Sequence, residues 1–168
     1  MHPTIRKIIS SNFVNYSLKV LIGFFIGYFL FKTFPNYNLF WSLLSIILVI
    51  SPEEVDSKKL TVERVKANFI GSLAGIAIWF LPIPDLAKIV MAIILALVTC
   101  RVFDVVKVAR TAIVAVLIVL IEHKNDDFLA PISRFFSVAG GCLIGLLVSV
   151  VVGNVRNYLL GETNNKEN

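Results

Sequence analysis

Six apolar segments, separated by short charged or proline-containing breaks, make up most of this 168-residue chain. Because 57% of the residues are hydrophobic and only 16% are charged, the composition is not that of a water-soluble domain. The pattern predicts an all-α, polytopic membrane protein with six transmembrane helices. Several segments are shorter than the ~20 residues that a bilayer crossing needs, so four spans with two re-entrant pieces is the alternative. The six segments are 18–34, 39–50, 67–81, 86–100, 105–121 and 132–152.

The distribution of Lys and Arg predicts the orientation of the chain. With the N-terminus in the cytoplasm, 12 of the 16 basic side chains fall on the inner side, a bias that favours both termini inside. Residues 1–16 are then a cytoplasmic N-terminus, 17–156 the membrane domain and 157–168 a disordered cytoplasmic tail. The basic residues lie at the ends of apolar segments rather than along one polar face, so the net charge of +5 does not indicate a nucleic-acid binder.

A short pattern occurs twice: an arginine is followed by glycines seven and eleven residues later. The offset maps the first three segments onto the last three and predicts two repeats, at about 17–82 and 86–153. Because each repeat holds an odd number of spans, the second would be inverted relative to the first, as in many transporters. The alternative is coincidence among glycine pairs that membrane helices favour anyway. The two copies are Arg64, Gly71 and Gly75, and Arg134, Gly141 and Gly145.

Three pairs of glycines are spaced four residues apart, so each pair falls on one face of a helix. Glycine lets another backbone approach closely, and the pairs predict close helix packing, including contacts between copies in a homo-oligomer. The alternative is that these faces slide or line a narrow pathway. The pairs are Gly23 and Gly27, Gly71 and Gly75, and Gly141 and Gly145.

Five basic residues near the ends of the segments are candidate anion contacts. Few acidic residues lie at matching depth, so these charges would lower the cost of bringing a carboxylate into a low-dielectric pathway. Arginine also grips a carboxylate with two hydrogen bonds. Taken singly, each residue is better explained as an anchor that reaches the lipid headgroups. The five are Lys19, Arg64, Arg101, Arg110 and Arg134, of which Arg64 and Arg134 are the better two.

Aromatic side chains gather in the first segment, where they face lipid or, alternatively, form a slot for an aromatic substrate ring. The chain carries no catalytic motif and no pair of buried carboxylates. Cys100 and Cys142 lack the spacing of a disulfide or metal site. The sequence therefore predicts no enzyme, no cofactor and no metal. The aromatic residues are Phe24, Phe25, Tyr28, Phe29 and Phe31.

After the second segment, Ser51 and Pro52 predict the stop of one helix and the start of the next, with Ser51 as its cap. This stop, the Trp41 hairpin, Ser57, and Arg64 with its two glycines resemble the membrane module of the fusaric acid resistance and aromatic acid exporter superfamily. Plant aluminium-activated malate transporters are distant relatives of that superfamily. The segment around Lys19 resembles its first helix, and Arg134 with its glycines resembles a later one. The resemblance covers nearly all of the spanning region.

The resemblance implies a six-helix module, often dimeric, that moves organic anions, commonly outward in bacteria. In contrast to the larger members, we expect no cytoplasmic domain here. We therefore expect a homo-oligomer in the bacterial inner membrane that exports organic anions, with aromatic carboxylates as candidate substrates, through a positively lined pathway. The alternative is a non-transporting scaffold or accessory subunit that binds anionic lipid or a partner protein.

Overall fold

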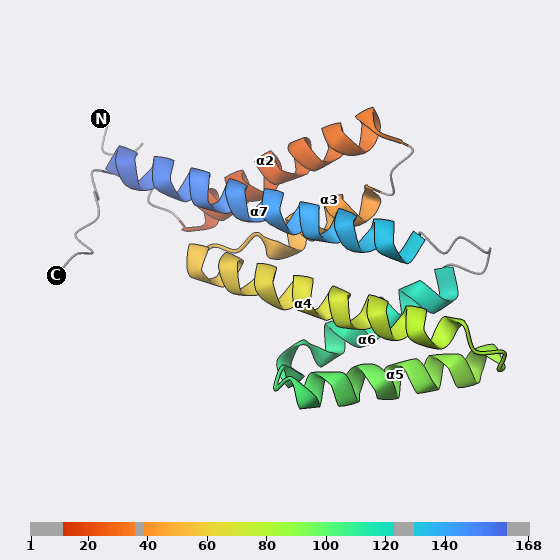
Figure 1. Ribbon diagram of the computed structural model, residues 1–168. Coiled ribbons are helices and arrows are strands. Elements are labelled where there is room, and N and C mark those ends of the chain that lie inside the picture. Colours follow the sequence, from red (N-terminus) through yellow and green to blue (C-terminus); the bar gives the residue numbers. More distant parts are fainter. Residues whose placement is uncertain (1–11, 36–38, 123–129, 161–168) are drawn as a thin grey trace. The chain divides into compact units, whose positions relative to one another are not determined.

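The computed structural model describes residues 12–35, 39–122 and 130–160, and this part of the chain is helical (Figure 1). The predicted all-α class is confirmed, and each of the six apolar segments corresponds to one α-helix. The predicted tail beyond residue 160 and most of the predicted cytoplasmic N-terminus lie outside the described residues. The elements are α2 (Asn12–Thr33), α3 (Phe40–Val49), α4 (Glu54–Trp79), α5 (Asp85–Val102), the 3-10 turn η1 (Val106–Val108), α6 (Ala109–Glu122) and α7 (Ala130–Leu160).

Helix α4 begins well before the third apolar segment, within a charged stretch. Its first turn carries Glu54 and Asp56, which are favoured at the positive end of the helix dipole. Ser51 does not cap it: the backbone N–H of Ser51 donates to the Ser57 hydroxyl at 2.9 Å. Helix α4 therefore starts two residues later than a helix capped by Ser51 would, because the chain leaves α3 in an extended conformation at Ile50 before it turns into α4.

The helices form two compact units. Unit 1 contains α2, α3, residues 54–61 of α4 and residues 140–160 of α7, and unit 2 is Val62–Ala139. Within unit 1, α2 packs against α3, and within unit 2, α5 packs against α6. Unit 1 therefore combines α2 and α3 with most of α7. Unit 2 combines α5 and α6 with most of α4.

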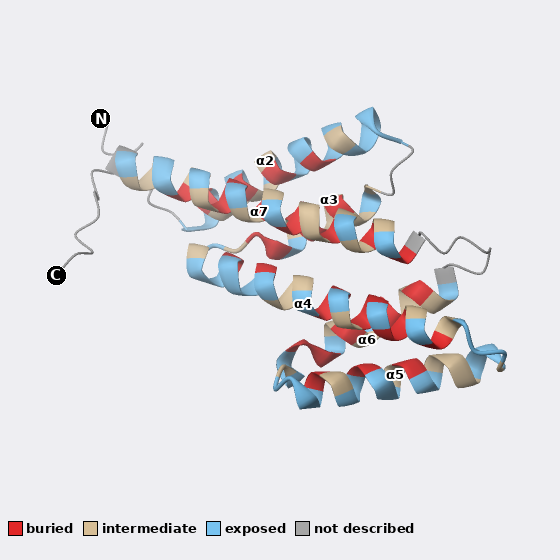
Figure 2. Cartoon of the chain, viewed as in Figure 1, coloured by how far each residue is buried: buried red, intermediate tan, exposed pale blue. Residues whose placement is uncertain are grey.

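The cores of the two units differ in composition. In unit 1, Ile46, Ile50 and Val148 form a buried cluster of branched side chains. In unit 2, the buried residues are mostly small, among them Ala67 and Ala112, which allows α4, α5 and α6 to approach closely. In Figure 2, buried residues colour parts of α4 and α6, while much of α5 is exposed.

The exposed surface is strongly apolar, as expected for helices that face hydrocarbon. Phe29 of α2 and Leu86 of α5 are 69% and 75% exposed. By length and composition, two helices of the described part are candidate membrane spans, Asn12–Thr33 and Pro131–Tyr158. Helix α3 is apolar but has only ten residues, or ~15 Å, half of the ~30 Å hydrocarbon core. The other crossings of the six-span arrangement stay a prediction.

Candidate functional site

Lys19, a predicted anion contact, is buried in unit 1 and bound to the backbone. Its side chain is 1% exposed. The Nζ atom donates to the carbonyl oxygens of Pro52 at 3.1 Å and Ser51 at 3.4 Å. These carbonyls follow the C-terminal end of α3, where a positive charge interacts favourably with the helix dipole. Lys19 thus holds the connection between α3 and α4 against α2.

A buried hydroxyl pair extends this polar cluster to α7. Ser57 and Ser149 are both fully buried, and their Oγ atoms lie 2.9 Å apart. The Ser57 hydroxyl also accepts the backbone N–H of Ser51, and the Ser57 carbonyl accepts the Thr61 hydroxyl at 2.8 Å. Hydrogen bonds of this kind satisfy polar groups that would otherwise be costly to bury. The cluster therefore fixes the start of α4 against α7 within unit 1.

Two further charged residues lie near Lys19. The Glu54 carboxylate attracts the Lys19 ammonium, and the Arg156 guanidinium repels it. Glu54 packs against Gly153 of α7, where an added Cβ would collide with its Oε1 atom. Arg156 donates from Nη2 to the side-chain oxygen of Asn12 at 3.2 Å. The charge on Lys19 is therefore partly balanced by a carboxylate that the sequence analysis did not connect to it.

The other four predicted anion contacts lie in unit 2, in different environments. Arg134 is buried, at 4% exposure, and donates from Nη1 to the Ala115 carbonyl of α6 at 3.3 Å. Arg64 is half-buried, and its own carbonyl accepts the Asn68 side-chain amide at 3.0 Å. Arg101 and Arg110 are exposed. Of these four, only Arg134 combines burial with a position inside a candidate span.

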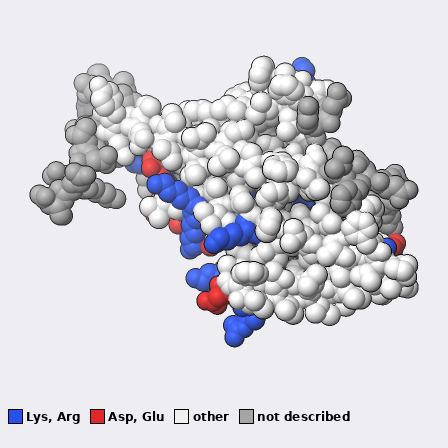
Figure 3. All heavy atoms as spheres, in the orientation of Figure 1, with Lys and Arg blue, Asp and Glu red and all other residues white. Residues whose placement is uncertain are grey.

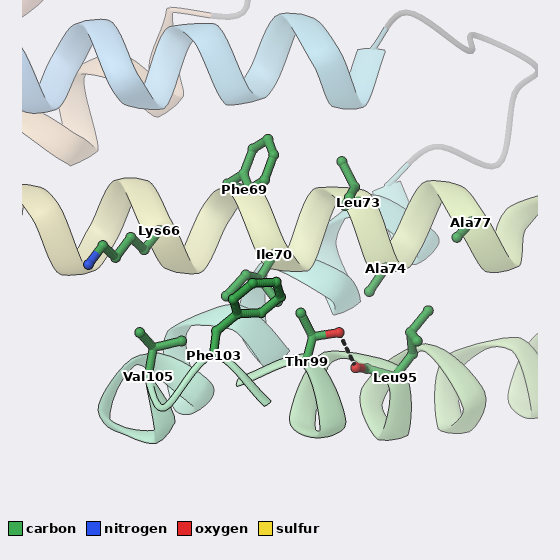
Figure 4. A pocket seen from close by; sticks show the side chains of 10 residues that line it. All are labelled: Lys66, Phe69, Ile70, Leu73, Ala74, Ala77, Leu95, Thr99, Phe103 and Val105. Carbon is green, nitrogen blue, oxygen red and sulfur yellow. Dashed lines mark hydrogen bonds between the residues drawn. The ribbon is translucent and has the colours of Figure 1, made fainter. Parts of the chain in front are cut away.

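A groove that the sequence analysis missed runs along unit 2 between α4 and α5 (Figure 4). Its volume is about 540 Å³. Helix α4 contributes Lys66 and Phe69 at one end and Ala77 at the other, while Phe103 and Val105 enter from the turn after α5. Lys66 is the only charged lining residue. None of the five predicted anion contacts is among the residues that line it.

The turn after α5 places the side chains of Phe103 and Val105 at the charged end of this groove. Asp104 adopts a left-handed conformation with a φ of 52°. Its backbone N–H donates to the Arg101 carbonyl at 3.2 Å, and that of Val105 donates to the Cys100 carbonyl at 2.8 Å. These two bonds are those of a Schellman motif, which normally has glycine at the left-handed position. The motif directs Phe103 and Val105 toward α4.

The described residues include no group of three or more His, Cys, Asp or Glu side chains that is able to hold a metal ion. Cys100 and Cys142 are buried free thiols.

Comparison with known protein families matches residues 17–148 to the family described as fusaric acid resistance protein-like. This range is more than three quarters of the 168-residue chain and contains Lys19, Arg134 and the whole groove. No curated protein and no solved structure matches the chain.

Proposed function

Because the chain belongs to the fusaric acid resistance protein-like family, a family of membrane proteins with a transport- or efflux-related role, we propose that it exports organic anions. Aromatic carboxylates are the candidate substrates. The membrane location and the transport-related role follow from the family. The class of solute, the direction and a pathway lined by cationic side chains are our proposal.

The burial of Arg134 is the observation that carries the choice of an anion. The residue lies in the second turn of α7, inside the candidate span Pro131–Tyr158, and is almost fully buried. A guanidinium is expensive to keep within a membrane segment, and ionisable residues in such positions mark solute and ion pathways. The planar guanidinium group also donates two parallel hydrogen bonds that match the two oxygens of a carboxylate. Arg64 occupies the corresponding position in the first half and is the second candidate.

We also propose that the two halves of the chain are inverted repeats. Two glycine contacts support a true repeat. An added Cβ at Gly71 would lie 2.5 Å from the Ala112 carbonyl oxygen, and one at Gly141 would collide with the Ser42 carbonyl oxygen. Gly141 follows Gly71 by 70 residues, and Ala112 follows Ser42 by the same 70. Matching partners at the same offset favour a repeat over coincidence between unrelated glycine pairs. The inversion itself is expected from the odd number of helices in each repeat.

The glycine contacts affect which helix faces are available for contacts between copies of the chain. Gly23 and Gly27 pack against α3, and Gly75 packs against Val119 of α6. These faces are occupied within the chain, so we propose that a homo-oligomer uses the exposed apolar faces of α2 and α5 instead.

The proposed location is the bacterial inner membrane with both termini in the cytoplasm. Figure 3 shows Lys and Arg side chains over the first half of α4 and near the end of α5, and Arg101, Lys107 and Arg110 after α5 are exposed. A basic end of unit 2 is what the positive-inside rule expects on the cytoplasmic side.

Flux through proteoliposomes tests the role of the arginines. Arg64 is half-buried, whereas Arg134 is buried and bonded to the Ala115 carbonyl, so Arg64→Gln is the variant that disturbs the core less. We expect it to lower the flux of an aromatic carboxylate about tenfold, since a charged hydrogen bond is worth ~1.5 to 3 kcal/mol. Lys32→Gln, an exposed charge in the last turn of α2, is the matched control and should leave flux unchanged. Equal flux in Arg64→Gln and wild type removes Arg64 from the pathway.

The second candidate function is a non-transporting scaffold that binds anionic lipid or a partner protein. It is favoured by the exposure of Arg101 and Arg110 and by the backbone bonds of Lys19. A folded oligomer that moves no carboxylate, together with retention of a lipid or a protein, distinguishes it from a transporter.

A further inference from the structure

We propose that the groove between α4 and α5 binds an anionic phospholipid of the bilayer, with one acyl chain in the groove and the phosphate at Lys66. The proposal concerns unit 2 alone and does not depend on transport. It rests on the chemistry of the groove lining, on the charges around one end of the groove, and on the exposed surface onto which it opens.

The groove lining is hydrocarbon along its length and charged at one end. Phe69, Leu73 and Ala77 of α4 and Leu95 of α5 line it. Ile70 and Ala74 of α4 also line it and point toward α5 (Figure 4). Thr99 also lines it, but its hydroxyl donates to the Leu95 carbonyl at 2.8 Å and is already engaged. The amine of Lys66 lies at the end where Phe103 and Val105 close the groove. A ligand that fits has a long apolar body and one negative group at its end.

Further basic residues lie close in sequence to the turn at the charged end of the groove. Arg101 and Lys107 flank the turn that carries Phe103 and Val105, and Arg110 follows in the first turn of α6. Lys66 and these three residues are all exposed, and Asp104 is the one acid between Arg101 and Arg110. Basic clusters at the cytoplasmic ends of membrane helices attract anionic headgroups, and one lysine near the surface contributes about 1 kcal/mol.

A lipid fits this groove better than a small soluble carboxylate does. Sites for soluble ligands place several polar groups to fix the orientation of the ligand. Here Lys66 is the only charged lining group, and the other lining residues apart from Thr99 are apolar. Of the lining residues, Phe69, Leu73 and Phe103 are 50%, 57% and 71% exposed, so the groove opens onto an apolar surface. A phospholipid already in the bilayer reaches such an opening by lateral diffusion, with its phosphate at headgroup level.

Native mass spectrometry of the full chain tests this site. The protein is reconstituted in vesicles of equal phosphatidylglycerol and phosphatidylcholine, extracted in a mild detergent, and its bound lipids are counted. We expect phosphatidylglycerol to be retained preferentially. Lys66→Gln should lower its retention about fivefold, the factor that ~1 kcal/mol represents. Lys88→Gln, near the N-terminal end of α5 and outside the groove, is the matched control and should change retention less than twofold.

A second variant tests the acyl chain separately from the headgroup. Ala77→Trp fills the apolar end of the groove from an exposed position, so it should fold and retain less phosphatidylglycerol although every charge is kept. Glycerol phosphate, which carries the same anion without acyl chains, should not displace the lipid. The proposal is overturned by equal retention of both lipids, by equal losses in Lys66→Gln and Lys88→Gln, by full retention in Ala77→Trp, or by displacement with glycerol phosphate.

Discussion

Gly141 of α7 lies directly against the backbone of Ser42 in α3: a Cβ at Gly141 would also come within 2.8 Å of the Ser42 Cα. Four residues on, a Cβ at Gly145 would lie 2.8 Å from the Ile46 carbonyl oxygen. The two helices therefore touch backbone to backbone over one turn, which only glycine permits. Through this contact the third helix of the second half docks on the second helix of the first.

The first prediction compares two adjacent glycines. Gly141→Ala should lower the thermal midpoint of the purified protein in detergent, because the backbone of Ser42 has no room to give and overpacking costs about 1 to 3 kcal/mol. Gly140→Ala is the control: nothing lies within 4 Å of its added Cβ, and alanine is the better helix former. Equal midpoints for the two variants would show that the close contact with Ser42 is not formed.

The second prediction concerns Lys19. Lys19→Met keeps the length of the side chain but leaves the carbonyls of Ser51 and Pro52 without their donor, which should cost about 1 to 3 kcal/mol of stability. Lys32→Met, an exposed lysine of the same helix, should cost less than about 0.5 kcal/mol. Thermal unfolding in detergent measures both. A Lys19→Met protein as stable as wild type but defective in carboxylate flux would instead assign this lysine to the pathway.

The third prediction ranks the members of the buried hydroxyl pair. Ser57→Ala removes both the partner of Ser149 and the acceptor of the Ser51 N–H, so it should cost more than Ser149→Ala, which removes one bond worth about 1 kcal/mol. The double variant should cost less than the sum of the two, because the shared bond is lost only once. Additive losses would mean that the two hydroxyls do not interact.

The fourth prediction concerns the left-handed residue in the turn after α5. Asp104→Gly should raise the thermal midpoint, because glycine adopts a positive φ without a steric penalty. Asp104→Val should lower it by about 1 to 2 kcal/mol, since a branched side chain is disfavoured there. If the two substitutions had the same effect, the turn would not adopt the left-handed conformation.

The sequence was sufficient to predict the helices and their approximate positions, because apolar segments of this length between polar breaks have few other structures available in a membrane. It was less informative about helix ends. Helix α4 starts at Glu54 and is not capped by Ser51. The extended conformation at Ile50, where the chain leaves α3, determines where α4 begins, and the preference of serine for the cap position does not. The sequence did indicate that the second segment, 39–50, is short, and α3 has ten residues.

The sequence did not predict which basic side chains are buried and which are exposed. Lys19 and Arg110 look alike as basic residues next to apolar segments, yet one is buried and bonded to carbonyls 32 and 33 residues away and the other is exposed. Such partners are set by tertiary packing. Ser149 offered the one available signal, since a lone serine within an apolar run suggests a buried hydrogen bond. The groove at Lys66 required the approach of α4 and α5 to be known.

Transport of a carboxylate by the purified chain tests the account most directly. In counterflow, proteoliposomes are loaded with an unlabelled aromatic carboxylate, diluted into a trace of the labelled compound, and sampled over time beside protein-free liposomes. The account predicts transient, saturable accumulation of label that excess external carboxylate abolishes and that Arg64→Gln strongly reduces. Accumulation no greater than in protein-free liposomes, with a folded protein in the membrane, would contradict it.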